Sequence, residues 1–165
     1  GYGNQSLEDV IGSLLKEKSQ TVAVAESCTG GLISSRLTDV SGSSEYILMN
    51  VVTYSNEAKT KLIKVPSDDF KQYGAVSEEV AKAMALGVRN LANATYGLSV
   101  TGIAGPSGGS QEKPVGTVYI GISTCYKTFA VRKNVNSSLH RKLIKWRFSQ
   151  LALEALRKTI LANCE

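Results

Sequence analysis

Residues 21–33 read Thr21-Val22-Ala23-Val24-Ala25-Glu26-Ser27-Cys28-Thr29-Gly30-Gly31-Leu32-Ile33. An apolar, β-branched run typical of a buried strand gives way to hydroxyl and thiol residues and two glycines, and the following residues have the spacing of a helix. In such a strand–turn–helix the free N–H groups at the start of the helix point into the turn, where they can hold an anion or an oxyanion. The stretch therefore predicts an α/β fold with a functional site at this turn.

Helical and strand patterns alternate along most of the chain. Hydrophobic spacing and capping residues predict helices over residues 6–18, 30–39 and 77–93, a short helix between Ser55 and Pro66, and a last helix capped by Ser137 and Ser138. Strands are expected over residues 20–26, 46–54, 96–101, 115–123 and 126–134, with 46–54 buried and the last two forming a hairpin. The last helix is expected to carry on its inner side Leu139, Leu143, Trp146, Leu153, Leu156 and Ile160. The alternation favours an α/β sandwich with a mixed sheet.

The composition fits one globular domain that spans residues 1–165. No apolar run reaches the roughly 20 residues that a membrane-spanning helix needs, so no membrane partner is predicted. Residues 1–6 are polar, show no signal peptide, and are expected to be a disordered terminus or a vector-derived remnant. The three cysteines are scattered, which argues against a disulfide framework and favours a cytoplasmic location.

Positive charge is concentrated near the C-terminus. Residues 127–158 hold nine basic residues and one acid, Glu154, whereas the whole chain has a net charge of +5. Aromatic residues do not alternate with these charges, as base stacking would require. We therefore interpret the segment as a solvated helix face and predict no specific nucleic-acid partner.

The chain offers few ligands for a metal and no nucleotide fingerprint. Its one histidine, His140, lies among basic residues far along the chain from the glycine-rich turns, and no cysteine–histidine spacing suits zinc. Neither glycine-rich loop matches the Walker or the dinucleotide-binding pattern. The sequence therefore predicts metal-independent chemistry without a cofactor.

A serine nucleophile without a histidine needs another base, and a buried, neutral lysine is the usual substitute. Lys59 is a candidate because it follows a strand-to-helix turn at Tyr54, and Lys61 and Lys64 are its rivals. Tyr54 is a candidate proton donor or relay, or a packing residue.

Two residues beside Ser27 leave alternatives open. Cys28 is a second candidate nucleophile, since a thiol at a helix N-terminus has a lowered pKa, or a small buried residue behind the turn. Glu26 has three candidate roles, which are to orient a lysine, to contact the substrate, or to cap backbone N–H groups. If the strands are neighbours, the N–H groups of residues 29–31 and those of the glycine-rich loop 102–109 meet and are suited to hold a phosphate.

Four motifs follow one another along the chain: Ala25-Glu26-Ser27-Cys28-Thr29-Gly30-Gly31; Tyr54-Ser55-Asn56 with Lys59; Tyr73-Gly74-Ala75-Val76-Ser77; and Thr101-Gly102-Ile103-Ala104-Gly105-Pro106 with Gly108-Gly109 and Lys113-Pro114-Val115-Gly116-Thr117. Together they resemble the C-terminal domain of the CinA, or competence/damage-inducible, family, which includes stand-alone nicotinamide mononucleotide deamidases. The resemblance covers residues 7–160. Larger family members carry a further N-terminal domain resembling molybdopterin-binding proteins, whose activities are not transferred here.

The resemblance implies a three-layer α/β/α sandwich with a mostly parallel sheet, commonly a homodimer, that hydrolyses the carboxamide of nicotinamide mononucleotide to nicotinate mononucleotide and ammonia. It makes Ser27 the nucleophile, Lys59 its base, Tyr54 an assisting residue and Thr101 a contact to the substrate or transition state. The expected substrate-binding residues are Glu26, Cys28, Thr29, Gly30, Gly31, Gly102, Gly105, Gly108 and Gly109.

The sequence is also compatible with two other classes of function. One is a non-catalytic, nucleotide-sensing or protein-binding module linked to competence or DNA damage. The other is a nucleic-acid binder that uses the basic segment 127–158. Ammonia release from the nucleotide, or binding without release, discriminates between an enzyme and a sensor.

Overall fold

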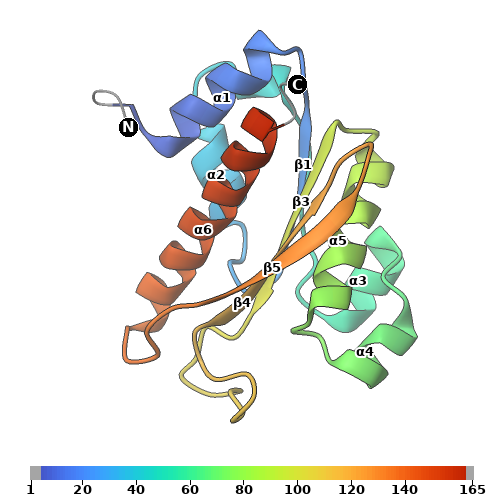
Figure 1. Ribbon diagram of the computed structural model, residues 1–165, viewed down its shortest axis with the longest axis vertical. Coiled ribbons are helices and arrows are strands. Elements are labelled where there is room, and N and C mark those ends of the chain that lie inside the picture. The colour runs from blue at the N-terminus through green and yellow to red at the C-terminus, as the bar shows by residue number, and fades with distance from the viewer. Residues whose placement is uncertain (1–4, 163–165) are drawn as a thin grey trace.

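A computed structural model describes residues 5–162 of the chain (Figure 1). The described chain forms the strands β1 (Val22–Glu26), β2 (Ile47–Val52), β3 (Tyr96–Gly102), β4 (Thr117–Ser123) and β5 (Thr128–Asn134). Its helices are α1 (Leu7–Glu17), α2 (Leu32–Thr38), α3 (Asn56–Ile63), α4 (Ser67–Tyr73), α5 (Glu78–Ala92) and α6 (Arg141–Ala162), with a short 3-10 helix η1 (Ser43–Glu45) before β2. None of these helices is long and apolar enough to cross a membrane.

The five strands form one sheet in the order β2-β1-β3-β4-β5. Strand β1 pairs in parallel with β2 and β3, whereas β3 with β4 and β4 with β5 pair antiparallel. Four of the five strands therefore run in one direction and β4 runs against them. Helices α1, α2 and α6 cover one face, and α3, α4 and α5 cover the other (Figure 1). The predicted three-layer α/β/α sandwich with a mixed, mostly parallel sheet is confirmed.

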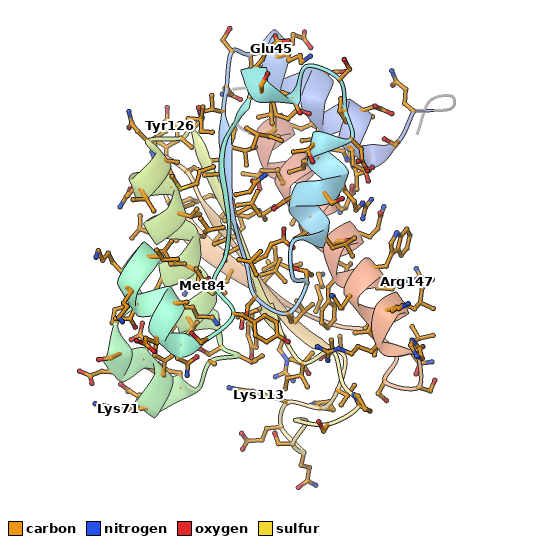
Figure 2. All side chains as sticks on the ribbon, turned by 180° about the vertical axis from the view of Figure 1, so that it is seen from behind. Glu45, Lys71, Met84, Lys113, Tyr126 and Arg147 are labelled. Atoms are coloured by element: carbon orange, nitrogen blue, oxygen red, sulfur yellow. The ribbon has the colours of Figure 1, made fainter. Side chains whose placement is uncertain are left out.

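Each face of the sheet has its own hydrophobic core. Val24, Leu98 and Phe148 belong to the larger core, under α1, α2 and α6. Ala23 and Met84 belong to the smaller one, on the side of α3, α4 and α5, and Figure 2 labels Met84 of α5. Strand β1 is buried along its whole length because both of its faces are covered. This explains its continuous apolar sequence and places the turn that follows it at the centre of the sheet edge.

Two predictions about strands and helices were wrong in detail. The run 46–54 was expected to be buried, but β2 is an edge strand, and Leu48 and Val52 are 47% and 48% exposed. Helix α4 was not predicted, because the sequence pattern was interpreted as one short helix that ends at Pro66. Here Pro66 is also the N-cap of the next one, a position where its missing N–H group is harmless.

The start of the first helix and the start of the last helix also differ from expectation. Ser6 is not disordered but caps α1, with its hydroxyl and the Asp9 carboxylate forming a reciprocal capping box. Residues 1–4 of the predicted disordered segment lie outside the described residues. Helix α6 starts only at Arg141, because the Ser138 hydroxyl bonds to Asn136 instead of capping a helix. As a result, Ile144 and Phe148 are buried, whereas the predicted inner residues Leu143 and Trp146 are exposed.

Candidate active site

The ends of β1, β2 and β3 bring three separate segments of the chain to one edge of the sheet. Ser27 follows β1, Tyr54 follows β2, and Gly102 ends β3. The Ser27 N–H group donates to the Val100 carbonyl at 3.0 Å, which fixes the start of the turn against β3. Between these segments lies a cavity of about 250 Å³, lined by Ser27, Cys28, Tyr54, Gly102, Ile103, Ala104, Gly105, Ser107, Gly108 and Arg141. The two glycine-rich turns therefore meet, as expected for neighbouring strands.

Lys59 lies directly behind Ser27. Its Nζ is 3.1 Å from the Ser27 Oγ and 3.0 Å from the Tyr54 carbonyl oxygen. The Ser55 hydroxyl accepts from the Ala58 N–H group and starts α3, which directs Lys59 inward on the first turn of the helix. Only 1% of Lys59 is exposed, although lysine is almost never fully buried without a partner charge. The geometry is that of a nucleophile with an adjacent base.

Burial lowers the pKa of Lys59, because an ammonium ion loses its hydration in this position. No carboxylate in residues 5–162 forms an ion pair with it to restore the charged form. Of its two rivals, Lys61 pairs with Glu57 at 2.6 Å on the surface and Lys64 is exposed. The structure therefore brings only Lys59 of the three lysines to Ser27.

Cys28, the second candidate nucleophile, lies beside Ser27 as a buried thiol. Burial raises its pKa to about 12, so it carries no thiolate at neutral pH. The lowered pKa expected for a thiol at a helix N-terminus is therefore wrong. The alternative, a small buried residue behind the turn, is confirmed, since Cys28 is only 7% exposed.

Glu26 takes the place that an external anion would occupy at the start of α2. Its buried carboxylate accepts from the N–H groups of Gly31, Ile33 and Ser34 at 3.1, 3.1 and 2.8 Å, and from the Ser34 hydroxyl at 2.6 Å. Of the three roles left open for Glu26, the structure shows backbone capping. Of the N–H groups expected to hold a substrate phosphate, that of Gly31 is therefore paired with Glu26, and that of Gly30 donates to the Ser27 carbonyl.

Replacing Glu26 with alanine is expected to lower the free energy of unfolding by about 2–4 kcal/mol, because four donors lose a buried, charged acceptor. Urea denaturation followed by circular dichroism measures the loss. Glu57→Ala on exposed α3 is the control and should change stability by less than about 0.5 kcal/mol. Equal stability of Glu26→Ala and the wild type would mean that the carboxylate does not hold the turn.

The structure divides the other predicted site residues among different places. Gly102, Gly105 and Gly108 line the Ser27 cavity, and Gly109 lines a larger neighbouring one. The Thr101 hydroxyl donates to the Ala75 carbonyl at 2.8 Å and holds the loop before α5, so Thr101 lies behind the cavity wall. Thr29, Gly30 and Gly31 face a third cavity on the other side of the turn.

Arg141 is the residue that the sequence did not single out. Its guanidinium donates to the Gly105 carbonyl and, at 3.3 Å, to the hydroxyl of Tyr54, which is 61% exposed. Within the basic segment nothing distinguishes Arg141 from its neighbours. Only the packing of α6 beside the loop brings it to the cavity, so no local signal identifies it.

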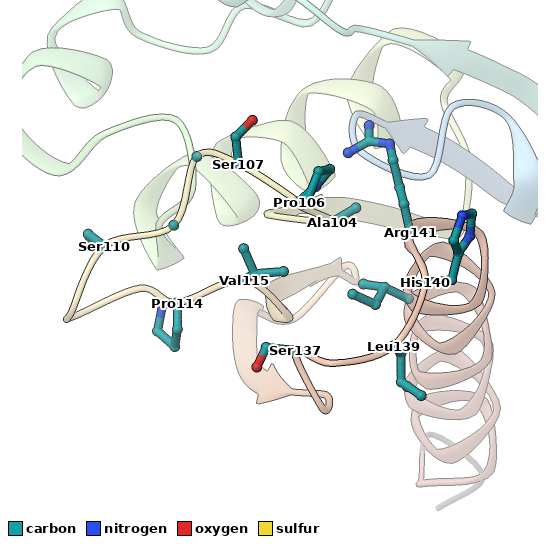
Figure 3. A pocket seen from close by; sticks show the side chains of 13 residues that line it. Ala104, Pro106, Ser107, Ser110, Pro114, Val115, Ser137, Leu139, His140 and Arg141 are labelled. Atoms are coloured by element: carbon teal, nitrogen blue, oxygen red, sulfur yellow. The ribbon is translucent and has the colours of Figure 1, made fainter.

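The neighbouring cavity has a volume of about 620 Å³ and lies between the glycine-rich loop and the start of α6. In Figure 3 Arg141 extends from the start of α6 toward Pro106 of the loop, and His140 lies at the same end of the helix. It shares Ala104, Ser107, Gly108 and Arg141 with the Ser27 cavity, so the two cavities lie side by side. No group of three potential metal ligands occurs in the described residues.

Residues 4–160 match the family model of the CinA C-terminal domain. The chain belongs to the CinA family. The CinA-like protein of Acaryochloris marina is 48% identical over 163 residues, which make up 99% of this chain and 39% of that protein. The CinA-like protein of Desulforapulum autotrophicum is 51% identical and covers 94% of this chain and 37% of its own length. This chain thus spans about two fifths of these curated relatives.

Solved structures of the CinA superfamily share the fold. The competence/damage inducible protein CihA of Agrobacterium tumefaciens superposes with a TM-score of 0.85 at 35% identity, covering 91% of this chain and 93% of its own. The competence damage-inducible protein A (ComA) of Klebsiella pneumoniae gives a TM-score of 0.90 at 29% identity, with 96% and 97% covered. The CinA resemblance of the four motifs is confirmed.

Proposed function

We propose that the chain is an amidohydrolase that converts nicotinamide mononucleotide and water to nicotinate mononucleotide and ammonia. The observation that carries the proposal is the 3.1 Å approach of the buried Lys59 Nζ to the Ser27 Oγ. The substrate comes from the family resemblance, and membership of the CinA family supports it. A Ser–Lys pair without a metal suits hydrolysis of an amide.

In the first half of the reaction Ser27 attacks the carboxamide carbon. Neutral Lys59 takes the hydroxyl proton while one of its N–H groups keeps the bond to the Tyr54 carbonyl. The tetrahedral intermediate then breaks its C–N bond, and the proton passes from Lys59 to the leaving nitrogen, which departs as ammonia. An ester of nicotinate mononucleotide remains on the Ser27 Oγ.

The second half hydrolyses this ester. Water attacks the acyl carbon, Lys59 accepts its proton and returns it to the Ser27 Oγ as the acid leaves. The Cys28 N–H group lies directly after the nucleophile and has no oxygen acceptor in the described chain, so we assign it to the oxyanion. The Gly30 and Gly31 N–H groups already donate to Ser27 and Glu26 and are not free for this role.

The size and charge of the combined cavity suit a mononucleotide. The Ser27 pocket takes the carboxamide ring, and the 620 Å³ cavity beside it has room for ribose phosphate. Arg141 lies where the two meet and supplies a cation for the phosphate, and the glycine-rich loop exposes backbone to it. A homodimer in the cytoplasm is part of the proposal, supported by the resemblance and by the uncharged free edge of β2.

Ammonia release from nicotinamide mononucleotide, nicotinamide riboside and nicotinamide tests the substrate. We expect kcat/KM for the nucleotide to exceed that for the riboside by at least about 100-fold, since charge-assisted bonds to phosphate are worth about 1.5–3 kcal/mol each. Equal activity on all three compounds contradicts the assignment of Arg141 and its cavity. Tight binding of the nucleotide without ammonia release identifies a sensor instead.

A further inference from the structure

The turn after β1 has a second side, away from Ser27. There Thr29, Gly30 and Gly31 form one wall of a cavity of about 460 Å³, which is lined in full by Thr29, Gly30, Gly31, Leu32, Ser35, Lys142, Lys145 and Trp146. None of these residues lines the Ser27 cavity or its 620 Å³ neighbour. Its volume lies in the range of small-molecule sites, about 300–1,000 Å³.

The accessible charge of this second cavity is positive. Lys142 and Lys145 lie one turn apart on α6, and neither forms an ion pair or a side-chain hydrogen bond within residues 5–162. The Lys145 Nζ lies 3.4 Å from the position of a Cβ on Gly30, so the ammonium group extends over the turn. The nearby Glu26 is fully buried, accepts from its own four donors and forms no ion pair with either lysine.

A polar group and an aromatic group complete the wall. Thr29 is 0% exposed, and its Oγ1 has no hydrogen-bond partner within the described residues, although buried hydroxyls are normally paired. Trp146 is 44% exposed and lines the cavity together with Leu32, and the guanidinium groups of Arg36 and Arg147 lie 5.5 and 5.7 Å from its ring centroid. The Thr29 hydroxyl lies beneath the surface, whereas the two lysines and the indole line the cavity and together suit a phosphate that carries a planar ring.

We propose that this second cavity binds a nucleoside monophosphate as a second molecule, distinct from the substrate at Ser27. Lys142 and Lys145 bind the phosphate, and Trp146 contacts the base. The bound molecule touches Thr29, two residues after Ser27, and Lys142, the residue after Arg141, so it lies beside the catalytic cavity without entering it.

Fluorescence titration tests the site, because Trp146 is the single tryptophan of the chain. Adenosine monophosphate is the probe, with excitation at the red edge of the indole band, where adenine does not absorb. We expect a saturable change whose Kd rises at least about tenfold in Lys142→Ala/Lys145→Ala. Lys127→Ala/Lys133→Ala, which removes the same charge from β5 and the residue before it, should bind like the wild type.

Three results would overturn the proposal. The first is no saturable change with adenosine monophosphate, or an equal Kd in the Lys142/Lys145 variant. The second is inorganic phosphate that binds as tightly as adenosine monophosphate, because the base then contributes nothing to the affinity. The third is a tenfold rise in KM for nicotinamide mononucleotide in that variant without any added nucleotide, which makes the cavity part of the substrate site. Because the readout is binding, it is independent of whether the chain hydrolyses an amide.

Discussion

Replacing Ser27 with alanine is expected to lower kcat for ammonia release from nicotinamide mononucleotide by at least about 10⁴-fold, since removing a nucleophile leaves only binding and oxyanion contacts. The fold should persist, because the Ser27 N–H bond to Val100 does not involve the side chain. Substrate affinity, measured by calorimetry, should stay within about threefold of the wild type, since the hydroxyl contributes mainly to the transition state. Initial-rate ammonia assays measure the loss.

Cys28→Ala is the matched control, one position further along the turn. Its thiol is neutral and buried, so kcat should fall by less than about tenfold, through packing alone. If Ser27→Ala retains near-normal turnover while Cys28→Ala is inactive, the nucleophile has been assigned to the wrong residue.

Replacing Lys59 with methionine is expected to lower kcat by about 10²–10⁴-fold, the usual contribution of a general base. Methionine fills the same buried volume, so the loss reports the amine rather than a cavity. In the wild type, kcat/KM should rise with pH through the pKa of Lys59, which burial holds below its ordinary value of 10.5. The residual activity of Lys59→Met should lack this rise. If the activity of Lys59→Met still follows the pH profile of the wild type, Lys59 is not the base.

Lys59→Met, which should lower activity, should raise the stability of the fold at low pH. The pKa of Lys59 is lower in the folded than in the unfolded state, so the folded wild type binds fewer protons and gains stability as pH rises between the two values. Below the folded-state pKa the burial penalty is complete. Lys59→Met should therefore be more stable than the wild type at low pH, with an advantage that shrinks as pH rises toward 10.5. Urea denaturation across this range measures it, and an advantage independent of pH would contradict buried charge as the cause.

Local patterns predicted the framework of the site. The apolar run of β1 and the break at Ser27 define a strand and a turn within a few residues, and the helix that carries Lys59 follows from the Ser55 cap. Because β1 and β3 are neighbours, their turns had to meet at one edge. The match of four motifs to the CinA domain added the pairing of Ser27 with Lys59.

Contacts between distant segments account for what the sequence did not predict. Glu26 turns its carboxylate onto α2, and this depends on the angle at which the helix leaves the turn rather than on any local preference. Arg141 reaches the site only because α6 starts three residues later than Ser138 and lies beside the loop at Gly105. Exposure of Val52 depends on β2 being at the sheet edge, which an apolar run cannot reveal.

Reaction of the wild-type protein with nicotinamide mononucleotide in the presence of hydroxylamine detects a covalent intermediate on Ser27. An ester on Ser27 partitions between water and this nucleophile, so the hydroxamate of nicotinate mononucleotide should form at the expense of the acid. Total ammonia release should not change when formation of the ester limits the rate, and Ser27→Ala should form no hydroxamate. Acid as the only product at saturating hydroxylamine, or hydroxamate formation by Ser27→Ala, would contradict a covalent intermediate on Ser27.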